Sequence, residues 1–109
     1  ETNLRALTCL RANVEPFAER AEVLAQDGLG APPVERRGTA QLVLTNPPTH
    51  APPEVLNRLL GDVAPWMASG GVALAVVSRP GRAAQAFDAV GAKVHVYEVG
   101  SFHIVEARF

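Results

Sequence analysis

The uninterrupted apolar run from Val72 to Val77 constrains the fold of this chain more than any other sequence feature. A strand with one face in water alternates apolar and polar residues, whereas a continuous apolar run is typical of a parallel strand covered on both faces. The run is also far too short to span a bilayer. Residues 72–78 are therefore predicted to form a parallel strand of an α/β sheet.

Helical and strand-like patterns alternate around this run. Apolar residues at helical spacing predict a helix near residues 2–14, with Thr2 or Asn3 as its N-cap. A second amphipathic helix is predicted over 53–67, kinked or restarted at Pro65 and ended by Gly70-Gly71, and a third helix is stopped by Gly91. Strands are predicted at 21–26, 41–45, 72–78, 93–99 and 102–109.

The order of these elements predicts the topology. Strands that alternate with helices indicate an α/β domain with a mostly parallel sheet. The last two strands are joined only by Gly100-Ser101, so they are predicted to form an antiparallel hairpin. Ligands of such sheets bind beyond the carboxyl ends of the strands. Residues 46–50 follow the strand at 41–45, so they lie at such an end.

Composition narrows the classes of partner. The 109 residues suit one domain, with 48% apolar and 19% charged residues and a net charge of −1. This charge shows no electrostatic preference for nucleic acid or for a membrane. Cys9 is the single cysteine, which excludes an internal disulfide and a cysteine-based zinc site and fits the cytoplasm. His95 and His103 are predicted to lie on the two hairpin strands, where they would face each other, but a histidine pair without a third ligand predicts no metal site.

The sequence Asn46-Pro47-Pro48 carries the clearest chemical signal. The two prolines fix φ near −65° and lack backbone donors, which holds nearby carbonyl groups out of sheet pairing. Together with the side chain of Asn46, they offer acceptors for both hydrogens of a neutral amine, whose lone pair is then oriented toward an electrophile. An ordinary turn is the alternative, because Asn-Pro and Pro-Pro are common in loops.

Three stretches resemble a known family: "LVLTNPPTH", "MASGGVALAVVS" and "GSFHIVEARF". They are similar to the C-terminal half of class I S-adenosylmethionine-dependent methyltransferases, most of all the small-subunit ribosomal RNA guanine-N2 methyltransferases. The resemblance implies a Rossmann-like sheet, S-adenosylmethionine as cofactor and ribosomal RNA as substrate. Relatives that methylate adenine N6 or a glutamine side-chain amide share the Asn-Pro-Pro sequence, so these acceptors stay open, as does a degenerate domain without catalysis.

The resemblance also implies roles for single residues. Asn46 and Pro47 would bind the target amine, with Asn46 also bordering the cofactor, and Pro48 and His50 would line the substrate pocket. Thr49 stands where the family usually has an aromatic residue that stacks on the target base. Two further residues would bind the cofactor, Glu1 through the ribose hydroxyls and Asp27 through the adenine. A chain terminus and a plain Asp-Gly turn are the alternatives for these two.

The family's sheet order, 3-2-1-4-5-7-6, has a consequence for this chain. Residues 1–109 match strands 3 to 7 and at most the last residue of strand 2, so they are expected to form a partial methyltransferase domain in which the first strands are missing. The family's glycine-rich cofactor loop would precede Glu1. The remainder of a longer chain, or a second copy, is expected to complete the sheet.

Overall fold

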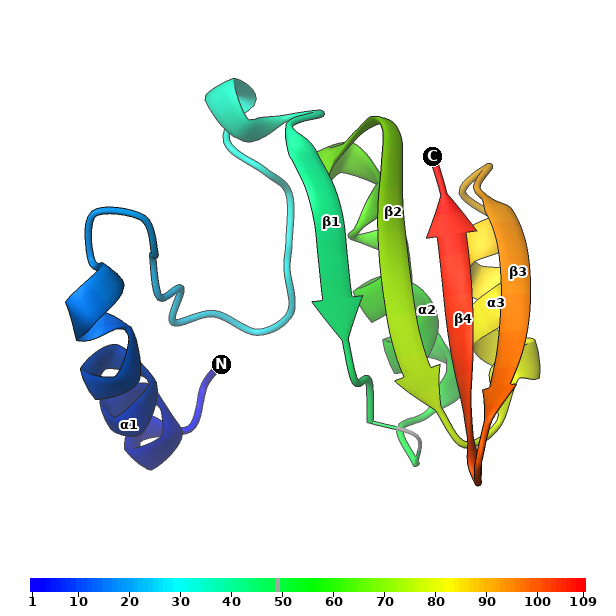
Figure 1. Ribbon diagram of the computed structural model, residues 1–109, viewed down its shortest axis with the longest axis horizontal. Helices are drawn as coiled ribbons and strands as arrows, with labels where there is room; N and C mark the ends of the chain where they lie inside the picture. Colours follow the sequence, from blue (N-terminus) through cyan, green and yellow to red (C-terminus); the bar gives the residue numbers. More distant parts are fainter. Residues whose placement is uncertain (49) are drawn as a thin grey trace.

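The computed structural model describes residues 1–48 and 50–109, in which four strands form one sheet (Figure 1). The strands are β1 (Ala40–Thr45), β2 (Met67–Val77), β3 (Lys93–Val99) and β4 (Phe102–Arg108), in the order β1-β2-β4-β3. β1 pairs with β2 in parallel, and β4 is antiparallel to both β2 and β3. β1, β2 and β3 therefore run in one direction. This order reproduces the 4-5-7-6 end of the family's sheet and confirms the terminal hairpin.

Helices cover one face of this sheet. α2 (Pro53–Gly61) and α3 (Pro80–Asp88) lie behind the strands in the view of Figure 1. The core forms between these helices and the sheet, around Phe87, Leu60 and Val105, whose exposed fractions are 0%, 1% and 0%. Small residues of β2, Ala73 and Ala75, face this layer, and both are fully buried.

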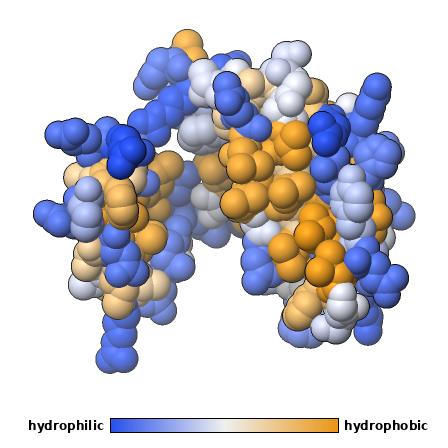
Figure 2. All heavy atoms as spheres, in the orientation of Figure 1, coloured by the Kyte–Doolittle hydropathy of each residue, from blue (hydrophilic) through white to orange (hydrophobic). Residues whose placement is uncertain are grey.

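The opposite face of the sheet is open in the described residues. Leu42 and Leu44 of β1 are 57% and 70% exposed, and Val76 of β2 is 39% exposed. Figure 2 shows apolar side chains across this face. α1 (Leu4–Val14) lies beside the sheet rather than over it (Figure 1). The expectation that the 72–77 strand is covered on both faces is therefore wrong for the described residues: helices cover one face only.

The N-terminal helix begins as expected. The side chain of Asn3 accepts hydrogen bonds from the backbone N–H groups of Arg5 and Ala6, at 3.0 and 3.1 Å. This is the N-cap geometry that satisfies donors in the first turn of a helix. Two short 3₁₀ turns, Glu15–Phe17 and Val34–Arg36, interrupt the long connection from α1 to β1.

The predicted strand at 21–26 is absent from the sheet that the structure describes. This segment has no regular structure, and the terminal amino group of Glu1 donates to the carbonyl groups of Gln26 and Leu24, at 3.0 and 3.4 Å. An extended segment becomes a strand only when a neighbour pairs with its backbone along several residues. In the described residues this segment has no such pairing along its length.

The second helix ends earlier than predicted. α2 stops at Gly61, and Pro65 lies in a separate 3₁₀ turn, Ala64–Trp66, which confirms a restart near the proline. The role predicted for Gly70-Gly71 as a helix cap is wrong, because both glycines lie inside β2. They form a bulge there: Ala40 pairs with Met67, but Leu42 pairs with Val72.

Backbone geometry explains why glycine occupies both positions. Gly70 has a φ of +79°, a conformation that side chains disfavour. A Cβ atom on Gly71 would lie 2.9 Å from the carbonyl oxygen of Ala40 and 2.8 Å from the Cε atom of Met67. The pair therefore lets β2 pass close to β1 at the point where their register shifts.

Candidate functional site

A cavity of about 360 Å³ lies where β1 and β2 end and β4 begins. β1 and β2 are parallel, so their carboxyl ends meet at this edge, and the antiparallel β4 starts beside them. The cavity is lined by Asn46, Pro47, Pro48, His50, Val76, Val77, Ser78 and Phe102. This position is the one at which sheets of this kind bind ligands.

Asn46 and Pro47 occupy the rim of this cavity directly after β1. The side chain of Asn46 is exposed, and Pro47 is buried. The carbonyl of Pro48 accepts a hydrogen bond from the backbone N–H of Ala51, at 3.1 Å. Within residues 1–48 and 50–109, neither the side chain of Asn46 nor the carbonyl of Pro47 makes a hydrogen bond. These two groups are therefore the acceptors that the motif presents to a ligand.

Three further residues predicted to bind the substrate come directly after Pro47 in the sequence. Pro48 and His50 both line the cavity, and both are exposed. Thr49 lies outside the described residues. The loop thus brings together all the predicted substrate residues that the structure describes.

The cavity is also lined by residues of the family-like stretches to which the sequence analysis gave no site role. Phe102 is the first residue of β4 and is 54% exposed. Ser78 follows β2, and Val76 faces the open side of the sheet. The signal for Phe102 lies in the hairpin itself: an antiparallel return strand starts at the edge where the parallel strands end.

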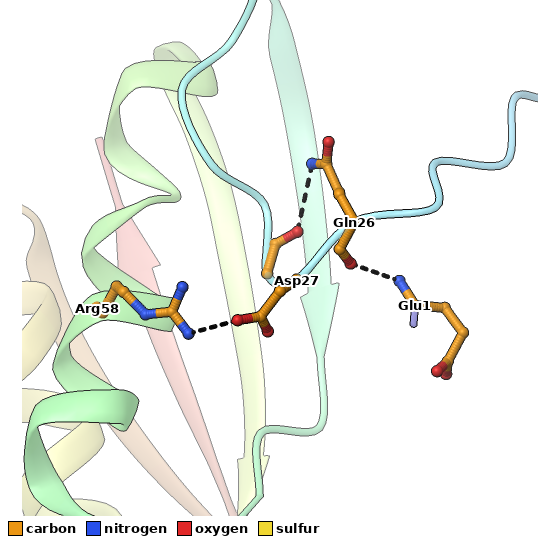
Figure 3. Close-up of polar contacts among 5 residues, drawn as sticks. Glu1, Gln26, Asp27 and Arg58 are labelled. Atoms are coloured by element: carbon orange, nitrogen blue, oxygen red, sulfur yellow. Dashed lines mark hydrogen bonds and ion pairs between the residues drawn. The ribbon is translucent and has the colours of Figure 1, made fainter. Parts of the chain in front are cut away.

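The two predicted cofactor residues lie close together (Figure 3). Glu1 contacts the backbone of Gln26, the neighbour of Asp27, and the carboxylate of Asp27 forms an ion pair with Arg58 of α2 at 3.1 Å. Both acidic side chains are exposed. The cavities that contain Asn46 are lined by neither of them. The structure therefore places Glu1 beside Gln26, the neighbour of Asp27, but it does not bring Glu1 or Asp27 into one cavity with Asn46.

The carboxylate of Glu1 is held by the start of α1. Its Oε1 atom accepts hydrogen bonds from the backbone N–H groups of Asn3 and Thr2, at 2.7 and 2.8 Å. The bond from Asn3, followed by that from Thr2, lowers the pKa of this carboxyl group. Glu1 is therefore charged at neutral pH and fixed in direction.

These acidic groups fit an adenosine. Glu1 uses only Oε1 and Asp27 only Oδ2 in hydrogen bonds within the described residues, which leaves one oxygen of each carboxylate as an acceptor. Ribose hydroxyls and the adenine amine are donors that such oxygens bind.

A metal site is not supported by the described residues, which contain no cluster of three ligating side chains. His95 pairs with Glu106 of β4, three residues from His103, so the two histidines lie on opposite faces of the sheet. The expectation that they face each other is wrong. Among the helices that the structure describes, none is long and apolar enough to cross a membrane.

Comparison with protein families identifies the fold. The family model of the methyltransferase small domain matches residues 1–106. The chain belongs to this family. This methyltransferase small domain therefore has the class I S-adenosylmethionine-dependent fold that its motifs indicated, and the family supports S-adenosylmethionine as its cofactor. No curated protein matches the sequence.

Solved structures share the fold at low sequence identity. A possible exported protein from Bordetella parapertussis has a TM-score of 0.77 and 11% identity, over 99% of this chain and 51% of that one. A SAM dependent methyltransferase from Aquifex aeolicus has a TM-score of 0.66 and 13% identity, over 99% of this chain and 65% of that one.

A third structure is precorrin-6y C5,15-methyltransferase from Geobacter metallireducens, with a TM-score of 0.62 and 18% identity. The match covers 100% of this chain and 65% of that one. The methyltransferase small domain thus spans about half to two thirds of these proteins.

Proposed function

We propose that this domain methylates an exocyclic amine, and that guanine N2 of ribosomal RNA is the acceptor. The observation that carries the proposal is the pair of acceptors on Asn46 and Pro47 at the rim of the cavity. A planar amine has two N–H donors, and two acceptors at one rim match them. The two hydrogen bonds then orient the lone pair of the nitrogen, and no strong base is needed for this.

When bound, S-adenosylmethionine would supply a methyl group whose bond to the positively charged sulfur breaks as its bond to the amine nitrogen forms, and the extra proton on that nitrogen would leave to water. The chain's part is to hold that amine and to stabilise the positive charge that develops on it. Carbonyl oxygens carry partial negative charge, so the acceptors on Asn46 and Pro47 serve both purposes. No carboxylate lines the cavity among the described residues, and His50 is its one titratable side chain. Positioning therefore fits the site better than general-base catalysis.

The position of Phe102 favours a nucleobase over a glutamine side chain as acceptor. Phe102 lines the same cavity as Asn46, and it is 54% exposed. An aromatic side chain binds a flat base by stacking, whereas a glutamine amide offers no ring. Phe102 thus supplies the aromatic face that the family usually places at the position of Thr49. Adenine N6 remains the rival acceptor, since it is also an amine on a flat ring.

We propose that the protein is located in the cytoplasm, because its proposed substrate is ribosomal RNA. We also propose that residues 1–109 are a partial domain whose sheet is completed by the rest of a longer chain or by a second copy. The exposed apolar side chains of Leu42 and Leu44 support this, as does the position of β1 at the end of the strand order. An uncovered apolar face and an unpaired edge are both features that proteins bury.

The test is methyl transfer by the Asn46→Ala variant of the full-length protein. Loss of one oriented hydrogen bond in the transition state costs about 2–4 kcal/mol, so turnover should fall by about 30-fold to 1,000-fold. The affinity for S-adenosylmethionine, measured by calorimetry, should change little. Asn57→Ala is the matched control, because Asn57 is an exposed asparagine on α2 that lines neither cavity containing Asn46.

The product separates the two nucleobase acceptors. RNA methylated in the assay is digested to nucleosides, and mass spectrometry against standards distinguishes N2-methylguanosine from N6-methyladenosine. Undiminished transfer by Asn46→Ala would remove this residue from the mechanism. N6-methyladenosine as the product would show that adenine N6, and not guanine N2, is the acceptor.

A further inference from the structure

A second cavity, of about 300 Å³, borders the cavity that Asn46 lines, which we call the acceptor cavity. It is lined by Pro47, Leu56, Val77, Arg79, Gly81 and Arg82. Pro47 and Val77 line both cavities, so the two cavities adjoin each other. The two arginines come from the start of α3, directly after β2.

The arginines of this second cavity lack acidic partners. Arg36, Arg58 and Arg108 form ion pairs, whereas neither Arg79 nor Arg82 lies within 4.0 Å of a carboxylate in the described residues. All six residues lining the cavity are neutral or positive. Two unpaired guanidinium groups at one cavity favour an anion, and arginine binds phosphate with two parallel hydrogen bonds.

Neighbouring elements do not cancel this charge. Glu54 lies in the first turn of α2 and Glu98 near the end of β3, and neither forms an ion pair with Arg79 or Arg82 within the described residues. α3 has no acidic residue in its first turn, and its N-terminal end carries partial positive charge that adds to that of the arginines.

We propose that Arg79 and Arg82 bind the phosphodiester backbone of the RNA that carries the acceptor amine. The proposal rests on the function proposed above. A base that enters the acceptor cavity brings its own sugar and the flanking phosphates to the neighbouring surface. The cavity lined by Arg79 and Arg82 shares Pro47 with the acceptor cavity. It therefore lies where such a phosphate would be held while Asn46 holds the amine.

This assignment also resolves a conflict between substrate and charge. The chain has a net charge of −1, so it has no overall attraction for RNA. Two local arginines supply affinity for the backbone without reading sequence. They would distinguish a polynucleotide from a free base, because only the polynucleotide presents phosphates on both sides of the target.

The experiment compares two double variants of the full-length protein. Arg79→Gln/Arg82→Gln removes the proposed contacts, and Arg5→Gln/Arg11→Gln on α1 removes the same charge elsewhere. Fluorescence anisotropy measures binding of a single-stranded RNA oligonucleotide from about 50 to 200 mM salt. Each phosphate contact contributes about 0.7 to the slope of log K against log salt, so the first variant should lose about 1.4 and the control should lose less.

Kinetics and a conservative variant separate binding from folding. Arg79→Gln/Arg82→Gln should raise KM for RNA while kcat at saturating RNA stays near that of the wild type. Arg79→Lys/Arg82→Lys keeps the charge and should recover most of the salt slope. Inorganic phosphate should compete with RNA only weakly, since it lacks the base that fills the acceptor cavity. Competition as strong as that of the oligonucleotide would identify a free-phosphate site instead.

The outcomes distinguish this inference from the function on which it rests. An unchanged salt slope and KM in the glutamine variant, with transfer still lost in Asn46→Ala, would overturn the role of the arginines and leave the function intact. Failure of the wild-type protein to methylate or bind RNA would overturn both. A slope that falls equally in the α1 control would show a general charge effect and refute the specific site.

Discussion

Replacement of Phe102 by alanine tests the nature of the acceptor directly. Phe102 is the aromatic residue among those that line the acceptor cavity in the described structure. We expect Phe102→Ala to weaken binding of the nucleobase and to raise KM, while kcat changes little. The reason is that stacking holds the base before and during transfer, whereas Asn46 acts on the amine itself.

The stacking energy sets the expected change in KM, and the exposure of Phe102 sets the expected change in the free energy of unfolding. Base–aromatic stacking contributes about 1–3 kcal/mol per base, which corresponds to an increase in KM of about 5-fold to 150-fold. Full burial of a phenylalanine side chain contributes about 1.5–3 kcal/mol to stability. Phe102 is 54% exposed, so its removal should reduce the free energy of unfolding by roughly half that amount. The effect on substrate binding should therefore equal or exceed the effect on folding.

The strand beside Phe102 supplies the control. Val99 pairs with Phe102 across β3 and β4 and is also 54% exposed, but it does not line the acceptor cavity. Val99→Ala should therefore leave KM unchanged, and Phe102→Tyr should preserve stacking. The assay is steady-state methyl transfer to RNA, with thermal unfolding of each variant measured in parallel. Equal KM values for Phe102→Ala and Val99→Ala would refute stacking and would reopen a glutamine side chain as acceptor.

Three further predictions concern stability and the cofactor. Leu60→Ala should reduce the free energy of unfolding by about 2–5 kcal/mol in denaturant titration, because Leu60 is 1% exposed between α2 and the sheet. Arg58→Ala should change it by less than about 1 kcal/mol, since Arg58 and Asp27 are 48% and 76% exposed. Residues 1–109 alone should bind S-adenosylmethionine weakly or not at all, because Glu1 and Asp27 line no cavity with Asn46; micromolar affinity in calorimetry would show that the cofactor site is misplaced.

Features that depend on neighbouring residues were predictable from the sequence. The Val72–Val77 strand and the hairpin around Gly100-Ser101 follow from local patterns, and both are present. The motif predicts a ligand site at Asn46 and Pro47, and both residues line the cavity. In each case a short stretch of sequence determines the geometry.

Features that depend on distant partners were not predictable in this way. Phe102 lines the acceptor cavity because β4 lies between β2 and β3, an order that the family resemblance implies but that no single segment of the sequence encodes. The glycines of β2 are required by the approach of Ala40 from another strand. The segment at 21–26 has the residues of a strand but finds only Glu1 as a backbone partner among the described residues.

The open face of the sheet and the acceptor cavity are parts of one surface. Val76 lines the acceptor cavity and also the apolar hollow that Leu44, Leu74 and Ile104 form on the open face. Asn46 borders both. If residues from a longer chain or a second copy cover the open face, as proposed, they also lie beside Asn46. We expect that the same covering completes the cofactor site and closes the acceptor cavity, so that methyl transfer and completion of the sheet are gained together.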